Sequence, residues 1–141
     1  MIDVRILGRG EAHVLERVAE GVFDRAIDAA AANAFVSDPR LHLAVAVDDG
    51  TVVGMASGVH YHHPDKPVPE LWIDEVGVAP SHHRRGLASR LLATLIEHGR
   101  SLGCGQAWVL TERDNQAAMQ LYAKAGGEPS DCVMFTFRSV L

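Results

Sequence analysis

The sequence has few of the residues that mark secreted, metal-binding or nucleic-acid-binding proteins. Only two cysteines occur among its 141 residues, and Cys104 and Cys132 lie far apart without a CxxC spacing. A disulfide framework and a thiol redox motif are therefore disfavoured. Positive charge is in the minority, with 13 Lys and Arg against 18 Asp and Glu and a net charge of −5. This balance argues against nucleic-acid partners, because polyanions bind to clustered positive charge.

Long apolar runs are also missing. No stretch of about 18 uninterrupted apolar residues occurs, so we expect no membrane-spanning helix. The first ten residues, MIDVRILGRG, lack the basic and apolar regions of a signal peptide. Eight histidines are present, but the clusters at residues 60–63 and 82–83 have no zinc-ligand spacing. The expectation is a cytoplasmic protein that binds neither membrane nor metal.

What is present fits one globular domain over residues 1–141. Apolar residues make up 48% of the chain and charged residues 22%, as in core-forming proteins of this length. Near the N-terminus we expect a strand at Val4 to Leu7 and a helix over residues 14–22, where apolar side chains recur with helical spacing. A second, alanine-rich helix is expected to begin with Asp24 as its cap and to end before Pro39.

Strand patterns dominate the middle of the chain. Leu41 to Val47 and Thr51 to Tyr61 flank Asp48-Asp49-Gly50, which predicts a β-hairpin. The predicted elements that follow are a loop over residues 62–69, a strand over 70–79, a helix from Gly86 to Leu102-Gly103, a strand over 106–111, a helix around 118–122 ending at Gly126-Gly127, and a last strand over 133–138. This order predicts a mixed α/β domain.

The segment from Val76 to Leu92 carries the strongest chemical signal. A strand ends at Ala79, a turn with Pro80 follows, and Gly86 stands where an amphipathic helix begins. The first N–H groups of a helix have no internal acceptor and attract anions, and glycine permits close approach. A phosphate-binding turn is one interpretation, and an ordinary strand-turn-helix with solvated arginines is the other. The segment matches neither a Walker P-loop nor a G-x-G-x-x-G turn.

The same segment resembles the GNAT superfamily of acetyl-CoA-dependent N-acetyltransferases. The family signature [Q/R]-x-x-G-x-[G/A] aligns with the six residues from His83 to Ala88, departing only at His83. That loop acts chiefly through backbone amides, so we expect the change to be tolerated. A second motif of the family resembles NQAAMQLYAKAGG, through Asn115, Ala118, Leu121, Tyr122 and Gly126. The resemblance covers roughly residues 41 to 138.

The resemblance implies the GNAT fold, of α/β (α+β mixed) class, in which a central, mostly antiparallel, splayed sheet is flanked by about four helices. The strand at 72–78 would part from the strand at 106–111, and the pantetheine arm of acetyl-CoA would bond to the backbone between them, by strand addition. The pyrophosphate would rest on the amides of residues 84–89. The implied cofactor-binding residues are Val76, Gly77, Val78, His83, Arg84, Arg85, Gly86, Leu87, Ala88, Ser89, Asn115, Ala118 and Tyr122.

Acetyl transfer to an amine needs a base for the amine proton, a donor for the carbonyl oxygen and an acid for the leaving thiolate. Tyr122 matches the family tyrosine near the cofactor sulfur, which implies the acid role, whereas a core aromatic is the alternative. We favour Glu75 as the base, with Asp74 as the alternative. Successive strand residues face opposite sides, so strand register decides between them. A backbone N–H near Val76 would contact the carbonyl oxygen.

Within the superfamily the segment from Glu70 to Leu92 most resembles aminoglycoside 3-N-acetyltransferases. This implies acetylation of a primary amine of an aminoglycoside and, through it, antibiotic resistance. Carboxylates on the expected substrate side fit a cationic substrate, although solvated loop charges give the same pattern. The predicted substrate contacts are Asp74, Glu75, Glu112 and Asp114. Asp65 and Glu70 are nearby, and the only cationic residues among them are Lys66 and Arg113.

Two other functions stay open from the sequence. One is acetylation of another amine, such as a polyamine, an amino acid or a protein N-terminus. The other is a non-catalytic module that binds acetyl-CoA, against which the presence of Tyr122 and the Asp74-Glu75 pair argues. The resemblance also makes a homodimer plausible, through the final strand.

Overall fold

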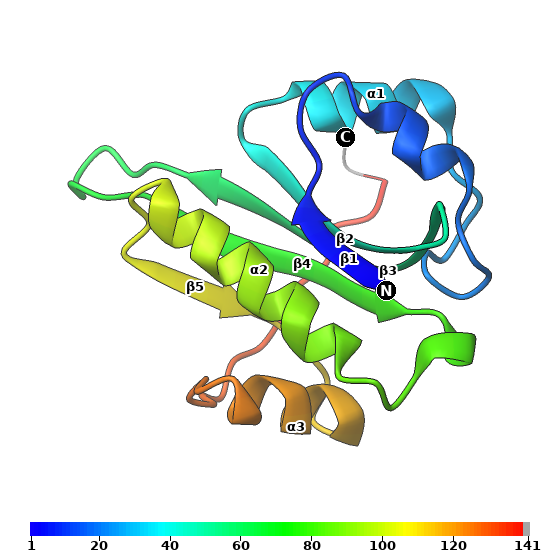
Figure 1. The fold of residues 1–141 in the computed structure, drawn as a ribbon. Helices are drawn as coiled ribbons and strands as arrows, with labels where there is room; N and C mark the ends of the chain where they lie inside the picture. The colour runs from blue at the N-terminus through cyan, green and yellow to red at the C-terminus, as the bar shows by residue number, and fades with distance from the viewer. Residues whose placement is uncertain (140–141) are drawn as a thin grey trace.

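A five-stranded sheet forms the centre of the computed structural model, which describes residues 1–139 (Figure 1). The strands lie in the order of the sequence, and every neighbouring pair is antiparallel except the parallel pair β4 and β5. This arrangement confirms the predicted mixed α/β class with a mostly antiparallel sheet. The strands are β1 (Ile2–Ile6), β2 (Leu41–Asp48), β3 (Thr51–Tyr61), β4 (Glu70–Val78) and β5 (Gln106–Val109).

The predicted hairpin joins β2 to β3. Asp48 pairs with Thr51, and the two residues between them have positive φ angles, 47° at Asp49 and 76° at Gly50. Positive φ at both central positions matches the right-handed twist of the flanking strands, and Asp-Gly adopts it readily. The local sequence therefore fixes the turn and the pairs next to it, whereas a β-bulge at Val53 shifts the register of the rest of β2 and β3.

Three α-helices and two short 3-10 helices pack around the sheet within the described residues. They are η1 (Ala12–Glu16), α1 (Ala29–Ser37), η2 (Pro80–His82), α2 (Leu87–Ser101) and α3 (Gln116–Lys124). Helix α2 crosses one face of the sheet, as Figure 1 shows, whereas η1 and α1 cover the other. None of these helices combines the length and the apolar character that crossing a membrane requires.

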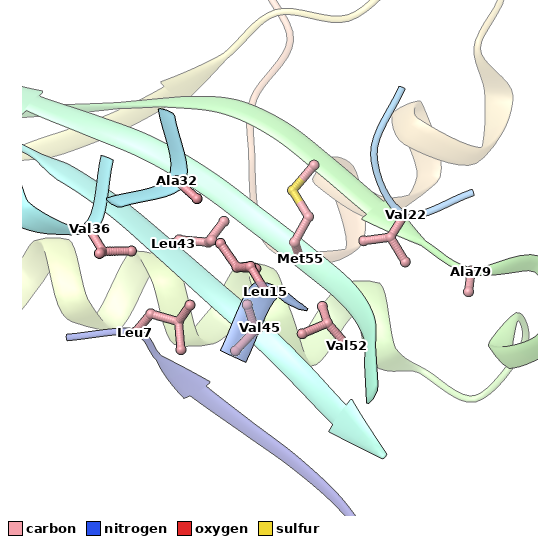
Figure 2. Close-up of a cluster of buried hydrophobic side chains, with 10 residues drawn as sticks. All are labelled: Leu7, Leu15, Val22, Ala32, Val36, Leu43, Val45, Val52, Met55 and Ala79. Atoms are coloured by element: carbon pink, nitrogen blue, oxygen red, sulfur yellow. The ribbon is translucent and has the colours of Figure 1, made fainter. Parts of the chain in front are cut away.

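Strand alternation divides the buried side chains into two layers. On β2, Leu43 and Val45 face α1 and η1, in the cluster drawn in Figure 2. Ala44 and Ala46 face the opposite way, toward buried leucines of α2 such as Leu91. The small alanines on this face leave room for the helix to lie close to the sheet. We call the two layers the α1 face and the α2 face.

The helix predicted over residues 14–22 is wrong. Only Ala12–Glu16 is helical, as η1, and the chain from Arg17 to Asp28 is irregular. Backbone hydrogen bonds to β3 replace helical ones, because Ala19 N–H donates to the Val52 carbonyl at 2.9 Å and Val52 N–H donates to the Arg17 carbonyl at 2.8 Å. We call residues 17–28 the N-terminal loop. Residues 1–139 thus contain three α-helices where about four were expected.

Helix α1 begins later than predicted. Its cap is Asp28, whose Oδ1 accepts a hydrogen bond from Ala31 N–H at 2.9 Å, and Asp24 lies outside the helix. The helix ends at Ser37, as Pro39 predicted.

The strand predicted over residues 133–138 is also wrong for this chain. Residues 128–138 form no regular secondary structure and are exposed. Helix α3 ends where the glycines predicted, since Gly126 has a φ of 96° and Gly127 N–H donates to the Tyr122 carbonyl at 2.9 Å. Strand β5 stops at Val109, two residues before the predicted end.

Candidate active site

Strands β4 and β5 part from each other half-way along β4. Their parallel pairing runs from Glu70 with Gln106 to Ile73 with Val109, whereas β4 continues to Val78. Within the described part of the chain, residues 74–78 have no strand partner on that side. Unpaired backbone groups at a strand edge can bond an extended ligand as an added strand. The predicted splay is therefore present, and it begins at Asp74.

A β-bulge at Asp74 decides which acidic side chain faces which side. The paired positions on β4 pass directly from Ile73 to Glu75, which leaves Asp74 as the extra residue. After the bulge, Val76 packs on the α2 face. Its neighbour Glu75 consequently lies on the α1 face, below the N-terminal loop. Bulges commonly re-aim a side chain in this way beside functional sites.

The N-terminal loop lies directly against β4. A Cβ atom at Gly77 would come within 2.4 Å of the Val22 carbonyl oxygen, so only glycine allows this approach. The contact brings Asp24 toward Glu75. The pKa of Glu75 is raised above its ordinary value, first by partial desolvation and then by the negative charges of Asp74 and Asp24. Three carboxylates therefore gather at the open end of β4.

Asp24 is the site residue that sequence reasoning missed, because it was expected to cap a helix. The available signal was Gly21, which falls inside the predicted helix over 14–22 and has a φ of 86°. Glycine is unfavourable in a helix interior, and its positive φ ends helical geometry.

A cavity of about 820 Å³ opens beside this loop. Its lining comes from η1, the N-terminal loop and the start of α1. Three carboxylates line it, those of Glu16, Glu20 and Asp24, together with one guanidinium, that of Arg25, and one imidazole, that of His13. Asp24 thus belongs both to this cavity and to the acidic surroundings of Glu75.

The turn after β4 is held by two histidines. The Nε2–H of His83 donates a hydrogen bond to the Val78 carbonyl at 2.8 Å, and the Nε2–H of His82 donates one to Asp48 Oδ2 at 2.7 Å. The His82 hydrogen bond also lowers the pKa of Asp48. His83 is the position at which the chain departs from the family signature, and its side chain therefore holds the turn against the end of β4.

Beyond those histidines the backbone passes twice through left-handed geometry at the start of α2. Arg84 and Gly86 have φ angles of 62° and 72°, and Gly86 caps α2. Left-handed residues at a helix start turn successive N–H groups inward. A Cβ at Gly86 would meet no atom within 4 Å, so the space over the turn is open. The strand, the turn and the helix lie where the sequence predicted them, and Arg84 and Arg85 are exposed. Both interpretations of the turn share this geometry, so phosphate binding stays a prediction.

Tyr122 lies on the opposite face of the sheet from Glu75. It lies on α3, is partly buried and packs against the α2-face cluster. Burial raises the pKa of its phenol, which therefore carries its proton at neutral pH. Asn115 begins the same helix, with its side-chain oxygen accepting from Ala118 N–H at 3.1 Å. In this structure Asn115 and Ala118 fix the start of the helix that carries Tyr122, and their contacts with a cofactor remain a prediction.

The other predicted carboxylates are dispersed. Glu112 and Asp114 are exposed in the loop after β5, and Arg113 between them pairs with Asp131. Glu70 lies at the far end of β4, where hydrogen bonds from Gln106 at 2.6 Å and His63 at 2.5 Å lower its pKa. Glu70 is therefore a partner in structural hydrogen bonds rather than a free acceptor.

Comparison with known proteins assigns the chain to a family. The model of the acetyltransferase (GNAT) family matches residues 12–127. The chain belongs to this family. An acetyltransferase from Yersinia pestis (strain Pestoides F) is 30% identical over 104 residues, which cover 74% of this chain and 69% of that protein. An uncharacterized N-acetyltransferase from Mycobacterium bovis is 27% identical over 92 residues, covering 65% of this chain and 56% of the relative.

Solved structures of the same fold match almost the whole GNAT chain. An aminoglycoside acetyltransferase from an uncultured soil metagenomic sample superposes with a TM-score of 0.82 at 22% identity, covering 97% of both chains. The aminoglycoside N-acetyltransferase AAC(6′)-Iy in complex with CoA gives 0.75 at 21% identity, covering 99% of this chain and 95% of that one. A ribosomal-protein-alanine N-acetyltransferase from Brucella melitensis gives 0.74 at 17% identity, covering 98% and 99%. These likenesses show the fold.

Proposed function

We propose that this GNAT protein transfers the acetyl group of acetyl-CoA to a primary amine of an aminoglycoside. The observation that carries the proposal is the gathering of Asp24, Asp74 and Glu75 at the open end of β4, next to an anion-binding turn. An aminoglycoside is a polycation, so carboxylates favour it electrostatically. Two of the three structural neighbours described above are named aminoglycoside acetyltransferases, which supports this substrate class.

The residues of the donor side fit acetyl-CoA. The inward N–H groups of the turn at residues 84–89 suit a pyrophosphate, with Arg84 and Arg85 beside it. The unpaired edge at residues 74–78 suits the amide-bearing pantetheine arm. The neighbour in complex with CoA supports the same donor. When bound, acetyl-CoA supplies an acetyl group activated as a thioester.

On the acceptor side, Glu75 takes the proton from the substrate ammonium group, directly or through one water. Its raised pKa brings the carboxylate closer to neutral pH, which makes it a stronger base than an ordinary glutamate. Asp74 and Asp24 hold the cationic substrate nearby. Tyr122 gives its proton to the leaving thiolate, and the backbone N–H near Val76 contacts the carbonyl oxygen as charge develops there.

The position that is acetylated is the finer part of the proposal. The sequence resemblance favours the 3-amino group, whereas the neighbour AAC(6′)-Iy is named for the 6′ position. NMR of the acetylated product from a substrate with both amino groups separates the two, because acetylation shifts the protons beside the modified nitrogen.

A CoA-release assay with Glu75→Gln tests the base. We expect kcat for gentamicin to fall by about 10² or more while the affinity for acetyl-CoA changes little. Glu97→Gln, an exposed carboxylate on α2, is the matched control and should keep full turnover. Unchanged turnover in Glu75→Gln would remove Glu75 from this role.

A substrate panel tests the amine. Gentamicin, spermidine and a peptide with an N-terminal alanine are compared by kcat/KM, the last because of the Brucella melitensis neighbour named for that activity. Preference for spermidine or the peptide would replace the aminoglycoside assignment. A thermal shift with acetyl-CoA but no thiol release with any amine would instead indicate a binding module. Expression in a susceptible bacterium then shows whether turnover gives resistance.

A further inference from the structure

The two tryptophans of the chain stand outside its hydrophobic core. Among residues 1–139, the buried clusters of the α1 face and the α2 face contain neither Trp72 nor Trp108. Trp108 is 37% exposed, and Trp72 is partly buried. Aromatic side chains dominate the energetics of contacts, so those that a fold leaves outside its core are candidates for contact with a ligand.

Both tryptophans lie on the α1 face of the sheet. Leu71 and Ile73 pack on the α2 face, so Trp72 between them points to the α1 face. Trp108 on β5 pairs with Trp72 on β4, and the two rings stack with centroids 5.7 Å apart and planes 17° apart. On this face α1 and η1 pack over β2, which β3 and β4 separate from β5 (Figure 1). We call the two rings the tryptophan stack.

The bulge at Asp74 brings Glu75 next to the tryptophan stack. Trp72 pairs with Val59 and Glu75 pairs with Ser57, so the two are only two positions apart when measured along β3. Two positions of a strand span roughly 7 Å, and both side chains lie on the α1 face. This span is comparable with a six-membered ring and its amino substituent. A ring that rests on the stack can therefore present its nitrogen to Glu75.

Hydrogen bonds hold the tryptophan stack in place. The Nε1–H of Trp108 donates to the hydroxyl oxygen of Tyr61 at 2.6 Å, which links β5 to β3 across β4. The ring of Tyr61 packs edge-on to that of His63, and His63 is hydrogen-bonded to Glu70. Gln106 on β5 donates to the same carboxylate at 2.6 Å. An aromatic surface fixed in this way loses little conformational freedom when a ligand binds.

We propose that the tryptophan stack binds a saturated ring of the acetyl acceptor, so that the site prefers amines carried on such a ring over linear amines. This inference rests on the proposed function and names the part of the acceptor that is recognised. The C–H faces of an amino sugar or a cyclitol ring are apolar and pack on an indole, which also attracts ammonium groups. The neighbouring carboxylates bind the charged nitrogens. The aromatic and the acidic surfaces thus contact different atoms of one ring.

Isothermal titration calorimetry with gentamicin, in the absence of acetyl-CoA, tests the stack apart from catalysis. Trp108→Leu keeps an apolar side chain but removes the aromatic face, so the dissociation constant should rise by about 5-fold or more. Trp108→Phe keeps an aromatic face and should bind within about 2-fold of the unmodified chain. Leu102→Ala, which shortens an exposed side chain at the end of α2, is the matched control and should bind normally.

Two results of this titration overturn the proposal. One is unchanged affinity for gentamicin in Trp108→Leu with native circular dichroism. The other is an equal loss in Trp108→Leu and Trp108→Phe, because the affinity would then not depend on an aromatic face.

Tryptophan fluorescence gives a second test that needs no variant. The chain contains only two tryptophans, so its emission reports on the stack alone. Gentamicin has no aromatic group, and we expect it to change the emission saturably, whereas spermidine at the same ionic strength should change it less. Failure of gentamicin to bind, or unchanged emission at concentrations where calorimetry shows it bound, overturns the proposal.

Thiol release then separates this inference from the proposed function. If Trp108→Leu turns over gentamicin with an unchanged KM, the stack is no part of the acceptor site, whereas the proposed function stands. If gentamicin binds with the expected loss in Trp108→Leu but no amine gives thiol release, the proposed function fails and the ring-binding stack stands.

Discussion

Replacing His42 with glutamine is expected to flatten the fall in stability of this protein at acidic pH. His42 lies on β2, is only 6% exposed and stands between two other histidines. Its Nε2 is 2.7 Å from Nδ1 of His60 on β3, and its Nδ1 is 3.0 Å from Nε2 of His98 on α2. The three imidazoles form a hydrogen-bonded row in which a positive charge is unfavourable.

The size of the effect follows from the pKa of His42. Burial, and then the neighbouring charges of His98 and His60, lower that pKa from 6.5 to about 4, against a small opposing effect of Asp38. Because the folded value is depressed, the unfolded chain binds more protons between the two values, and stability is lost as pH falls from 6.5 toward 4. The loss from this group amounts to about 2.5 kcal/mol by pH 4.5. The pKa values of His60 and His98 are lowered too, which acts in the same direction.

Urea unfolding at several pH values between 7 and 4.5 measures this slope. His42→Gln loses part of the hydrogen-bonded row and is expected to be less stable at pH 7, but its stability should fall less on acidification than that of the unmodified chain. His13→Gln, at an exposed site in η1, is the control and should keep the original slope. If the His42→Gln and unmodified curves run parallel across this range, the reasoning from the buried row is refuted.

Two further predictions concern the site. Gly77→Ala places a Cβ against the Val22 carbonyl, so the free energy of unfolding measured in urea should fall by about 1–3 kcal/mol. The KM for the amine should rise, because the loop that carries Asp24 shifts. Unchanged stability would mean that the loop does not rest on β4. Tyr122→Phe keeps the ring but removes the proton, so kcat should fall about 10-fold or more with little change in the thermal midpoint. Unchanged turnover in Tyr122→Phe would make Tyr122 a packing residue.

The features that the sequence predicted correctly are those set by local chemistry. Asp49 and Gly50 adopt the positive φ angles of a tight hairpin, and Gly86 caps the start of α2. Each depends on the conformational preferences of one or two residues, which are visible without a structure. The turn that forms the proposed anion site belongs to this group, so its position could be predicted.

The features that could not be predicted depend on contacts between distant segments. Apolar residues at 14–22 have helical spacing, yet hydrogen bonds to Val52 hold this stretch as a loop. The side on which Glu75 lies depends on the bulge at Asp74, which only the pairing of β4 with β3 reveals. Residues 133–138 have the alternating pattern of a strand but form none, because such a pattern does not determine which strand a segment pairs with.

The division of charge across β4 follows from these same distant contacts. A net charge of −5 spread evenly would attract no particular substrate. The bulge turns Glu75 toward the α1 face, and the approach of Val22 to Gly77 adds Asp24 there, while Arg84 and Arg85 stay at the turn beyond the strand end. An anionic donor and a cationic acceptor would thus be drawn to different ends of one opening, and each would reach the reacting atoms from its own side. The irregular N-terminal loop is therefore as much a part of the proposed site as the motif beside it, because without Asp24 the acceptor side would lose one of its three carboxylates.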